Sequence, residues 1–164
     1  MTNMQASEDG IKPKKSLGQN FLVSQKDLNK IVNAADLKSS DTVVEIGPGT
    51  GLLTKLLTER AKSVIAVEKD KHLANFLEHK FQDIHNLKTI NCDALTWDHS
   101  VVTKPYKVVA NLPYYAANPI VRRFLESTHK PDLLVVTVQK EVAESMVAAK
   151  GKMRTLSLAV QLYC

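Results

Sequence analysis

The sequence predicts a doubly wound α/β fold built around a mostly parallel β-sheet. Short segments rich in Val and Ile alternate with segments in which apolar residues recur at helical spacing. Parallel strands need crossover connections, usually helices, so this alternation indicates a sheet that is covered on both faces. A length of 164 residues fits one domain of this kind.

The expected elements begin after residues 1–14, a polar segment ending in lysines that we interpret as a flexible basic leader. In 27–35 the apolar residues recur at helical spacing, and 42–46 (TVVEI) is typical of a buried strand. The same alternation predicts helices at 52–60, 72–81, 119–126 and 141–149, and strands at 63–67, 87–91, 107–110, 133–138 and 156–164. Because the chain stops inside the last of these, we expect a domain over 15–164 that is truncated in its sixth strand.

The composition excludes several classes of protein. Hydrophobic residues make up 44% and charged residues 24% of the chain, which argues against a disordered protein. No apolar run approaches the ~18 residues that span a bilayer. The polar, acidic start is unlike a signal peptide, so we expect a cytoplasmic protein without a membrane partner. Cys92 and Cys164 form no CxxC pair, and the pattern predicts no metal site.

A glycine loop follows the first predicted strand in the sequence EIGPGTG, which contains Gly47, Gly49 and Gly51. In open α/β sheets ligands bind outside the carboxyl ends of the strands, where glycine lets the backbone approach them closely. Glu68 ends the second strand 21 residues after Gly47, a spacing at which an acidic side chain accepts hydrogen bonds from ribose hydroxyls. The pair predicts an adenosine-containing cofactor; the alternative is a tight turn without a ligand.

The third and fourth strands end in two further candidate groups. Asp93 can accept a hydrogen bond from the adenine amine, although its position suits a helix N-cap equally well. The tetrapeptide Asn111-Leu112-Pro113-Tyr114 suits chemistry at an aromatic amine. The Asn111 side-chain oxygen and the Leu112 carbonyl can accept both amine hydrogens, Pro113 stiffens the loop, and Tyr114 can stack on the base.

Six motifs occur in order, and together they resemble the ribosomal RNA adenine N6,N6-dimethyltransferases of the KsgA type. They are KSLGQNFL from Lys15, EIGPGTG from Glu45, VE at 67–68, DAL from Asp93, ANLPY from Ala110 and QKEVA from Gln139. The resemblance implies a Rossmann-like S-adenosylmethionine-dependent methyltransferase fold with S-adenosyl-L-methionine as cofactor. It also implies the transfer of two methyl groups to N6 of each of two adjacent adenines. These lie in a hairpin loop near the 3′ end of small-subunit rRNA, so the reaction belongs to ribosome biogenesis.

The resemblance also implies residue roles. Asn20 and Leu22 would close over the cofactor, a role that only the resemblance suggests, and Gly47 would pass beside the cofactor's amino-acid portion. Glu68 would hold the ribose, Asp93 the adenine, and Asn111 would lie between the cofactor and the target amine. The sequence ends at Cys164, before the C-terminal helical domain that the family carries.

The net charge indicates the kind of partner to expect. Lys and Arg number 22 against 17 Asp and Glu, and the net charge of +5 favours a polyanionic partner. We expect a monomer that binds small-subunit rRNA or the pre-ribosomal small subunit through the basic residues Lys14, Lys15, Arg122, Arg123, Lys152 and Arg154.

Two alternatives stay open at this point. One is an Erm-type methyltransferase of large-subunit rRNA, although Leu112 before the Pro-Tyr pair and Pro119 favour the small-subunit group. The other is a non-catalytic RNA-binding assembly or transcription factor with the same fold. An intact set of Glu68, Asp93 and Asn111 argues against a site that has lost its activity.

Overall fold

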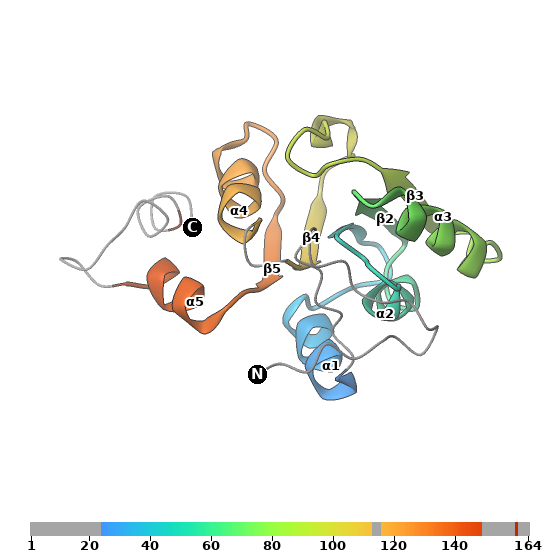
Figure 1. The fold of residues 1–164 in the computed structure, drawn as a ribbon, viewed down its shortest axis with the longest axis horizontal. Coiled ribbons are helices and arrows are strands. Elements are labelled where there is room, and N and C mark those ends of the chain that lie inside the picture. The colour runs from blue at the N-terminus through green and yellow to red at the C-terminus, as the bar shows by residue number, and fades with distance from the viewer. Residues whose placement is uncertain (1–23, 113–115, 149–159, 161–164) are drawn as a thin grey trace.

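The computed structural model describes residues 24–112, 116–148 and 160, which form a five-stranded sheet with helices on both faces (Figure 1). The strand order is β3-β2-β1-β4-β5, and all four pairings are parallel. The predicted doubly wound α/β fold is therefore confirmed. The elements are α1 (Gln25–Ala34), β1 (Thr42–Ile46), α2 (Leu52–Thr58), β2 (Ser63–Glu68), α3 (Lys71–Lys80), β3 (Leu87–Asn91), the 3₁₀ turn η2 (His99–Val101), β4 (Tyr106–Asn111), α4 (Ala117–Glu126), β5 (Leu133–Thr137) and α5 (Lys140–Met146).

The helix ends depend on contacts that a local pattern does not contain. α1 starts where the Ser24 side chain accepts a hydrogen bond from the Asp27 N–H. α2 ends at Thr58, two residues before the predicted end, and the Asn86 side chain donates to the carbonyls of Thr58 and Ala61. The Thr58 carbonyl lies at the helix end, where an outside donor replaces the missing helical partner. In the part of the chain that the structure describes, no helix is long and apolar enough to cross a membrane.

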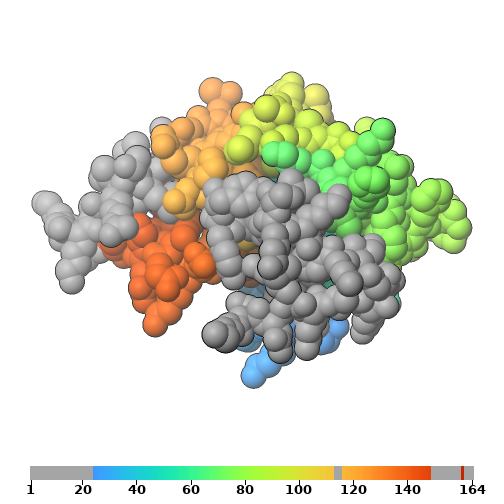
Figure 2. All heavy atoms as spheres, in the orientation of Figure 1, coloured from blue at the N-terminus to red at the C-terminus, as the bar shows by residue number. Residues whose placement is uncertain are grey.

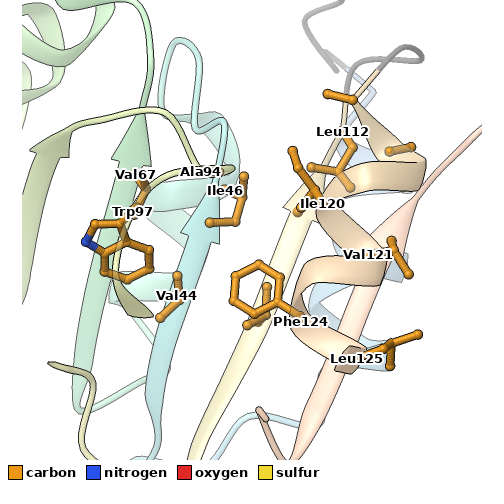
Figure 3. Close-up of a cluster of buried hydrophobic side chains, with 14 of the residues drawn as sticks. Val44, Ile46, Val67, Ala94, Trp97, Leu112, Ile120, Val121, Phe124 and Leu125 are labelled. Atoms are coloured by element: carbon orange, nitrogen blue, oxygen red, sulfur yellow. The ribbon is translucent and has the colours of Figure 1, made fainter. Parts of the chain in front are cut away.

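The core has two parts, one on each face of the sheet. Val43 packs with side chains of α1 and α2 on one face. Val44 and Ile46, which belong to the larger cluster, pack on the other face with Trp97 and with Phe124 of α4 (Figure 3). Neighbouring residues of β1 thus serve opposite layers, because successive side chains of a strand alternate between its faces. This double burial explains why apolar residues occur at consecutive positions, Val43 and Val44, rather than in strict alternation.

The predicted sixth strand, 156–164, lies outside the described residues except at Val160. The backbone of Val160 is helical, so the prediction of a strand is wrong at this residue. Its side chain packs against the larger core cluster. A short apolar run fits a buried helix as well as a buried strand, and periodicity alone does not separate the two.

Candidate active site

The candidate site lies at the carboxyl edge of the sheet, where the strand order changes direction. β1 pairs with β2 on one side and with β4 on the other, and Ile46 is in register with Val67 and with Ala110. The glycine loop after β1 therefore lies next to the last residue of β4, Asn111. In open α/β sheets this change of direction is the usual place for a ligand crevice.

The glycine loop has a backbone that glycine adopts more readily than other residues. Gly47, Gly49 and Gly51 have φ angles of 68°, 60° and 85°. These lie in the left-handed region, which residues with a Cβ atom rarely adopt. Gly51 is also the N-cap residue of α2. A Cβ atom at Gly51 would lie 2.4 Å from Cε2 of Phe81, so α3 packs directly against the end of the loop. At Gly47 a Cβ would meet no described atom within 4 Å, which leaves open space there.

Glu68 lies beside this loop, as predicted, and it also holds the loop in place. Its side chain is only 6% exposed. One carboxylate oxygen accepts the Gly49 N–H at 3.2 Å, and the other accepts the Asp70 N–H at 2.8 Å. Burial raises the pKa of Glu68, while the two backbone donors favour its charged form. The link from Glu68 to Gly49 spans 19 residues, and sequence reasoning did not find it.

Asp93 follows β3 on the same edge of the sheet. One carboxylate oxygen accepts the Leu95 N–H at 2.9 Å, so Asp93 caps the following turn. The other oxygen lies 2.7 Å from Nζ of Lys69, which hydrogen-bonds to Asp93 and so lowers its pKa. The alternative prediction was a helix N-cap, but the segment after Asp93 is a turn, so Asp93 caps a turn instead. The structure also adds a partner, Lys69, that sequence reasoning missed. The available signal was that Lys69 directly follows Glu68, at the end of the neighbouring strand.

Asn111 is the last residue of β4, one residue beyond the predicted end of that strand. The Thr137 hydroxyl donates a short hydrogen bond to Oδ1 of Asn111. Leu112 is 4% exposed and belongs to the larger core cluster, so its side chain anchors the segment and leaves only its backbone for a substrate. Pro113 and Tyr114 lie outside the described residues.

Glu45, the first residue of the EIGPGTG motif and the second-last residue of β1, is the most deeply buried acid of this edge. Its side chain is 1% exposed, and Oε2 has no hydrogen-bond partner among the described residues. Burial, with a smaller contribution from the nearby Glu68 carboxylate, raises the pKa of Glu45 to about 8. Sequence reasoning placed Glu45 in the motif without a role.

Comparison with known proteins decides the family. A family model described as "Ribosomal RNA adenine dimethylase" matches residues 10–164. The chain belongs to this family. A "Ribosomal RNA small subunit methyltransferase A" of Dehalococcoides mccartyi is 50% identical over 156 residues, which are 93% of this chain and 54% of that protein. The protein of the same name from Alkaliphilus metalliredigens is 48% identical, over 92% of this chain and 55% of that protein.

Solved structures of two related enzymes have the same fold. A dimethyladenosine transferase from Plasmodium falciparum gives a TM-score of 0.77 at 32% identity, over 88% of this chain and 53% of that one. The 23S rRNA methyltransferase ErmE gives a TM-score of 0.74 at 31% identity, over 85% of this chain and 56% of that one. The resemblance and the methyltransferase fold inferred from the motifs are thus confirmed. The chain spans about half the length of the curated relatives that it matches.

Within this member of the dimethylase family, two of the predicted RNA-binding residues have partners inside the chain. Arg122 pairs with Glu126, with its Nη2 atom 2.7 Å from the carboxylate. Arg123 donates to the Trp97 carbonyl at 2.7 Å, and so ties α4 to the segment after β3, which adjoins it on the surface (Figure 2). The remaining predicted RNA-binding residues, like the leader 1–14, lie outside the described residues; they are Lys14, Lys15, Lys152 and Arg154. The same holds for the two residues predicted to close over the cofactor, Asn20 and Leu22. Among the described residues, no group of three or more His, Cys, Asp or Glu side chains could hold a metal ion.

Proposed function

We propose that this chain forms the catalytic core of an S-adenosylmethionine-dependent rRNA adenine N6,N6-dimethyltransferase. The observation that carries the proposal is that Asn111 ends the strand next to β1, beside the glycine loop. A cofactor seated on that loop and an acceptor for the target amine would then share one crevice. The family match and the names of the curated relatives support the same activity.

The residues at this edge fit the cofactor. Space beside Gly47 suits a ligand that approaches the backbone, and Glu68 and Asp93 lie on the two neighbouring strand ends for the ribose and the adenine. Buried carboxyl groups such as Glu45 and Glu68 suit a positively charged ligand, because an opposite charge offsets the cost of burying an ionised acid. When bound, S-adenosylmethionine supplies an electrophilic methyl group on a sulfonium.

Asn111 and Leu112 would act on the target amine. The amine of adenine is a poor nucleophile, because its lone pair is delocalised into the ring. Oδ1 of Asn111 and the Leu112 carbonyl can each accept one amine hydrogen, which favours a pyramidal nitrogen whose lone pair is directed at the methyl group. A strong general base is unnecessary, since the amine becomes acidic only as the new bond forms.

We propose small-subunit rRNA as the substrate, with two adjacent adenines of a 3′-terminal hairpin loop each receiving two methyl groups. The curated relatives at 48–50% identity are named for the small subunit, whereas ErmE, a 23S rRNA enzyme, is 31% identical. An adenine in a loop is already partly unstacked, so its extrusion into a site costs less than from a duplex.

The test is a labelled-methyl transfer assay on isolated small and large ribosomal subunits, with the modified nucleotide mapped. We expect label in the small subunit, and we expect Asn111→Ala to abolish transfer while cofactor binding stays measurable by calorimetry. Asn29→Ala, an exposed asparagine on α1, is the matched control and should be as active as wild type. Label in the large subunit alone would identify the Erm-type activity, and label in neither would refute the enzymatic proposal.

A further inference from the structure

We infer that Asn91 is a positioning residue for the nucleoside part of the cofactor, because its side-chain NH₂ group holds the turn that carries Glu68 and Lys69. The inference rests on the proposed function, and it gives a role to a residue outside the six motifs. Asn91 is the last residue of β3, and in the parallel ladder it is paired with Glu68, the last residue of β2.

The NH₂ group of Asn91 bonds to two successive carbonyl oxygens. Nδ2 donates to the Glu68 carbonyl at 2.9 Å and to the Lys69 carbonyl at 3.2 Å. The Glu68 carbonyl also accepts the Cys92 N–H at 3.0 Å. An asparagine NH₂ group has two hydrogens, one for each carbonyl, whereas the amide oxygen in the same place would face two other oxygens. The Asn91 amide therefore has one favourable orientation.

These bonds hold the backbone just past the end of the sheet. The ladder between β2 and β3 ends at the pair of Glu68 and Asn91, so Lys69 lies one residue beyond it. The Asn91 side chain extends the connection between the two strand ends by that residue, because it bonds to the carbonyls on both sides of the Lys69 Cα atom. Both peptide groups that flank this Cα atom are thus held from β3.

Both acids that we expect at the nucleoside depend on this turn. The Lys69 carbonyl and the Asp70 N–H belong to one peptide group, and that N–H donates to the Glu68 carboxylate at 2.8 Å. Asn91 thus holds one end of a peptide group whose other end orients the ribose acid. Nζ of Lys69 lies 2.7 Å from the carboxylate of Asp93, the adenine acid. A shift of the turn would therefore move Glu68 and the partner of Asp93 together.

A site that is already ordered binds its ligand with a smaller loss of entropy, so the turn contributes to affinity through its fixed position. Deleting both Asn91 hydrogen bonds should weaken nucleoside binding by about three- to tenfold. Asn91 is exposed, so Asn91→Leu removes the donors without leaving a cavity.

Asn86 provides a matched control at the other end of the same strand. It directly precedes β3, and its Nδ2 atom also donates to two backbone carbonyls, those of Thr58 and Ala61. These carbonyls lie at the end of α2, whereas the glycine loop lies at its start. Asn86→Leu therefore removes the same kind of contact away from the cofactor.

The experiment measures, by calorimetry, the affinity of the intact protein for S-adenosylmethionine and for 5′-methylthioadenosine, which keeps the nucleoside and lacks the amino-acid portion. Asn91→Leu should weaken the binding of both ligands by the same factor, about three- to tenfold. Asn86→Leu should bind both within about twofold of wild type, although the two variants should lose similar stability in thermal denaturation. Asn91→Ala removes the same donors with a smaller side chain and should repeat the result.

Unchanged affinity in both Asn91 variants would overturn the inference. An equal loss of affinity in Asn86→Leu would also overturn it, because the effect would then be general destabilisation. A loss confined to S-adenosylmethionine would do the same, because it would place the effect at the amino-acid portion.

The inference and the proposed function fail in different ways. The proposed function is wrong if wild-type protein methylates neither subunit, whereas the affinities are measured without RNA and decide the role of Asn91 in either case. Wild-type protein that binds neither ligand would refute both. In the ligand-free protein, the Asp70 N–H signal should shift by NMR in Asn91→Leu and keep its position in Asn86→Leu. An identical Asp70 signal in wild type and Asn91→Leu would show that Asn91 does not hold this peptide group.

Discussion

Alanine substitutions at Gly47 and Gly51 separate two roles of the glycine loop, stability and cofactor binding. Both residues have positive φ, so an alanine at either position takes on similar backbone strain. Only at Gly51 does the new Cβ collide with other atoms, 2.4 Å from Cε2 of Phe81 and 2.8 Å from Cδ2 of Leu77. Gly47→Ala is therefore a matched control for the collision in Gly51→Ala.

The expected losses follow from these contacts. A left-handed backbone costs an alanine about 1–2 kcal/mol, which is the whole expected loss for Gly47→Ala. Overpacking against α3 adds about 1–3 kcal/mol, so Gly51→Ala should lose about 2–5 kcal/mol. Cofactor affinity should follow the opposite order, because the space beside Gly47 is where we expect the cofactor's amino-acid portion.

Urea unfolding, followed by Trp97 fluorescence, measures the loss of unfolding free energy, since Trp97 is the single tryptophan of the chain and is 7% exposed. Calorimetry with S-adenosylmethionine measures the cofactor affinity. An equal loss of unfolding free energy in the two variants would contradict the close approach of Phe81 to the loop. Unchanged cofactor affinity in Gly47→Ala would contradict the placement of the cofactor beside Gly47.

Three further substitutions test individual groups. Burial raises the pKa of Glu45 to about 8, so the protonated carboxyl contributes fully to the unfolding free energy below pH 4.5, and this contribution is lost as pH rises through 8. Glu45→Gln should therefore reduce the pH dependence of the unfolding free energy by up to ~1.4 kcal/mol per pH unit between pH 5 and 8, measured by urea unfolding. Parallel pH profiles of wild type and variant would refute this. Lys69→Met should raise the pKa of Asp93, seen by NMR titration, and change stability by less than about 1 kcal/mol; a fixed Asp93 pKa would show that Lys69 does not pair with it in solution. Tyr106→Phe deletes a buried donor to the His129 carbonyl and should cost about 1–3 kcal/mol in thermal denaturation, whereas an unchanged melting temperature would mean that water replaces the hydroxyl.

Local sequence patterns predict the fold and the edge that carries the site. Strands 42–46 and 87–91 have the predicted bounds, and the glycine loop follows the first strand and opens the next helix, as predicted. These features depend on residues within one segment, such as the alternation of apolar side chains or the left-handed φ of a glycine. A family resemblance carried by six local motifs is predictable for the same reason.

Contacts between segments are what the patterns did not reveal. The bond from Gly49 to Glu68 and the bond from Thr137 to Asn111 each join residues that meet only after the strands have paired in register. A shift of one residue between β4 and β5 would leave the sequence pattern of each strand unchanged and would remove the Thr137 contact. Register is a property of the assembled sheet, so these partners had no signal within their own segments.

Glu68 shows why stability and binding are coupled at this edge. A carboxyl group at 6% exposure is costly to ionise, yet its two oxygens accept the N–H groups of Gly49 and Asp70 and so fix the loop that follows β1. Ribose hydroxyls would have to share or replace those backbone donors, because they would bind the same two oxygens. On the proposed assignment the same two oxygens would serve the glycine loop and the ribose, so a substitution of Glu68 should alter the loop and the cofactor affinity together.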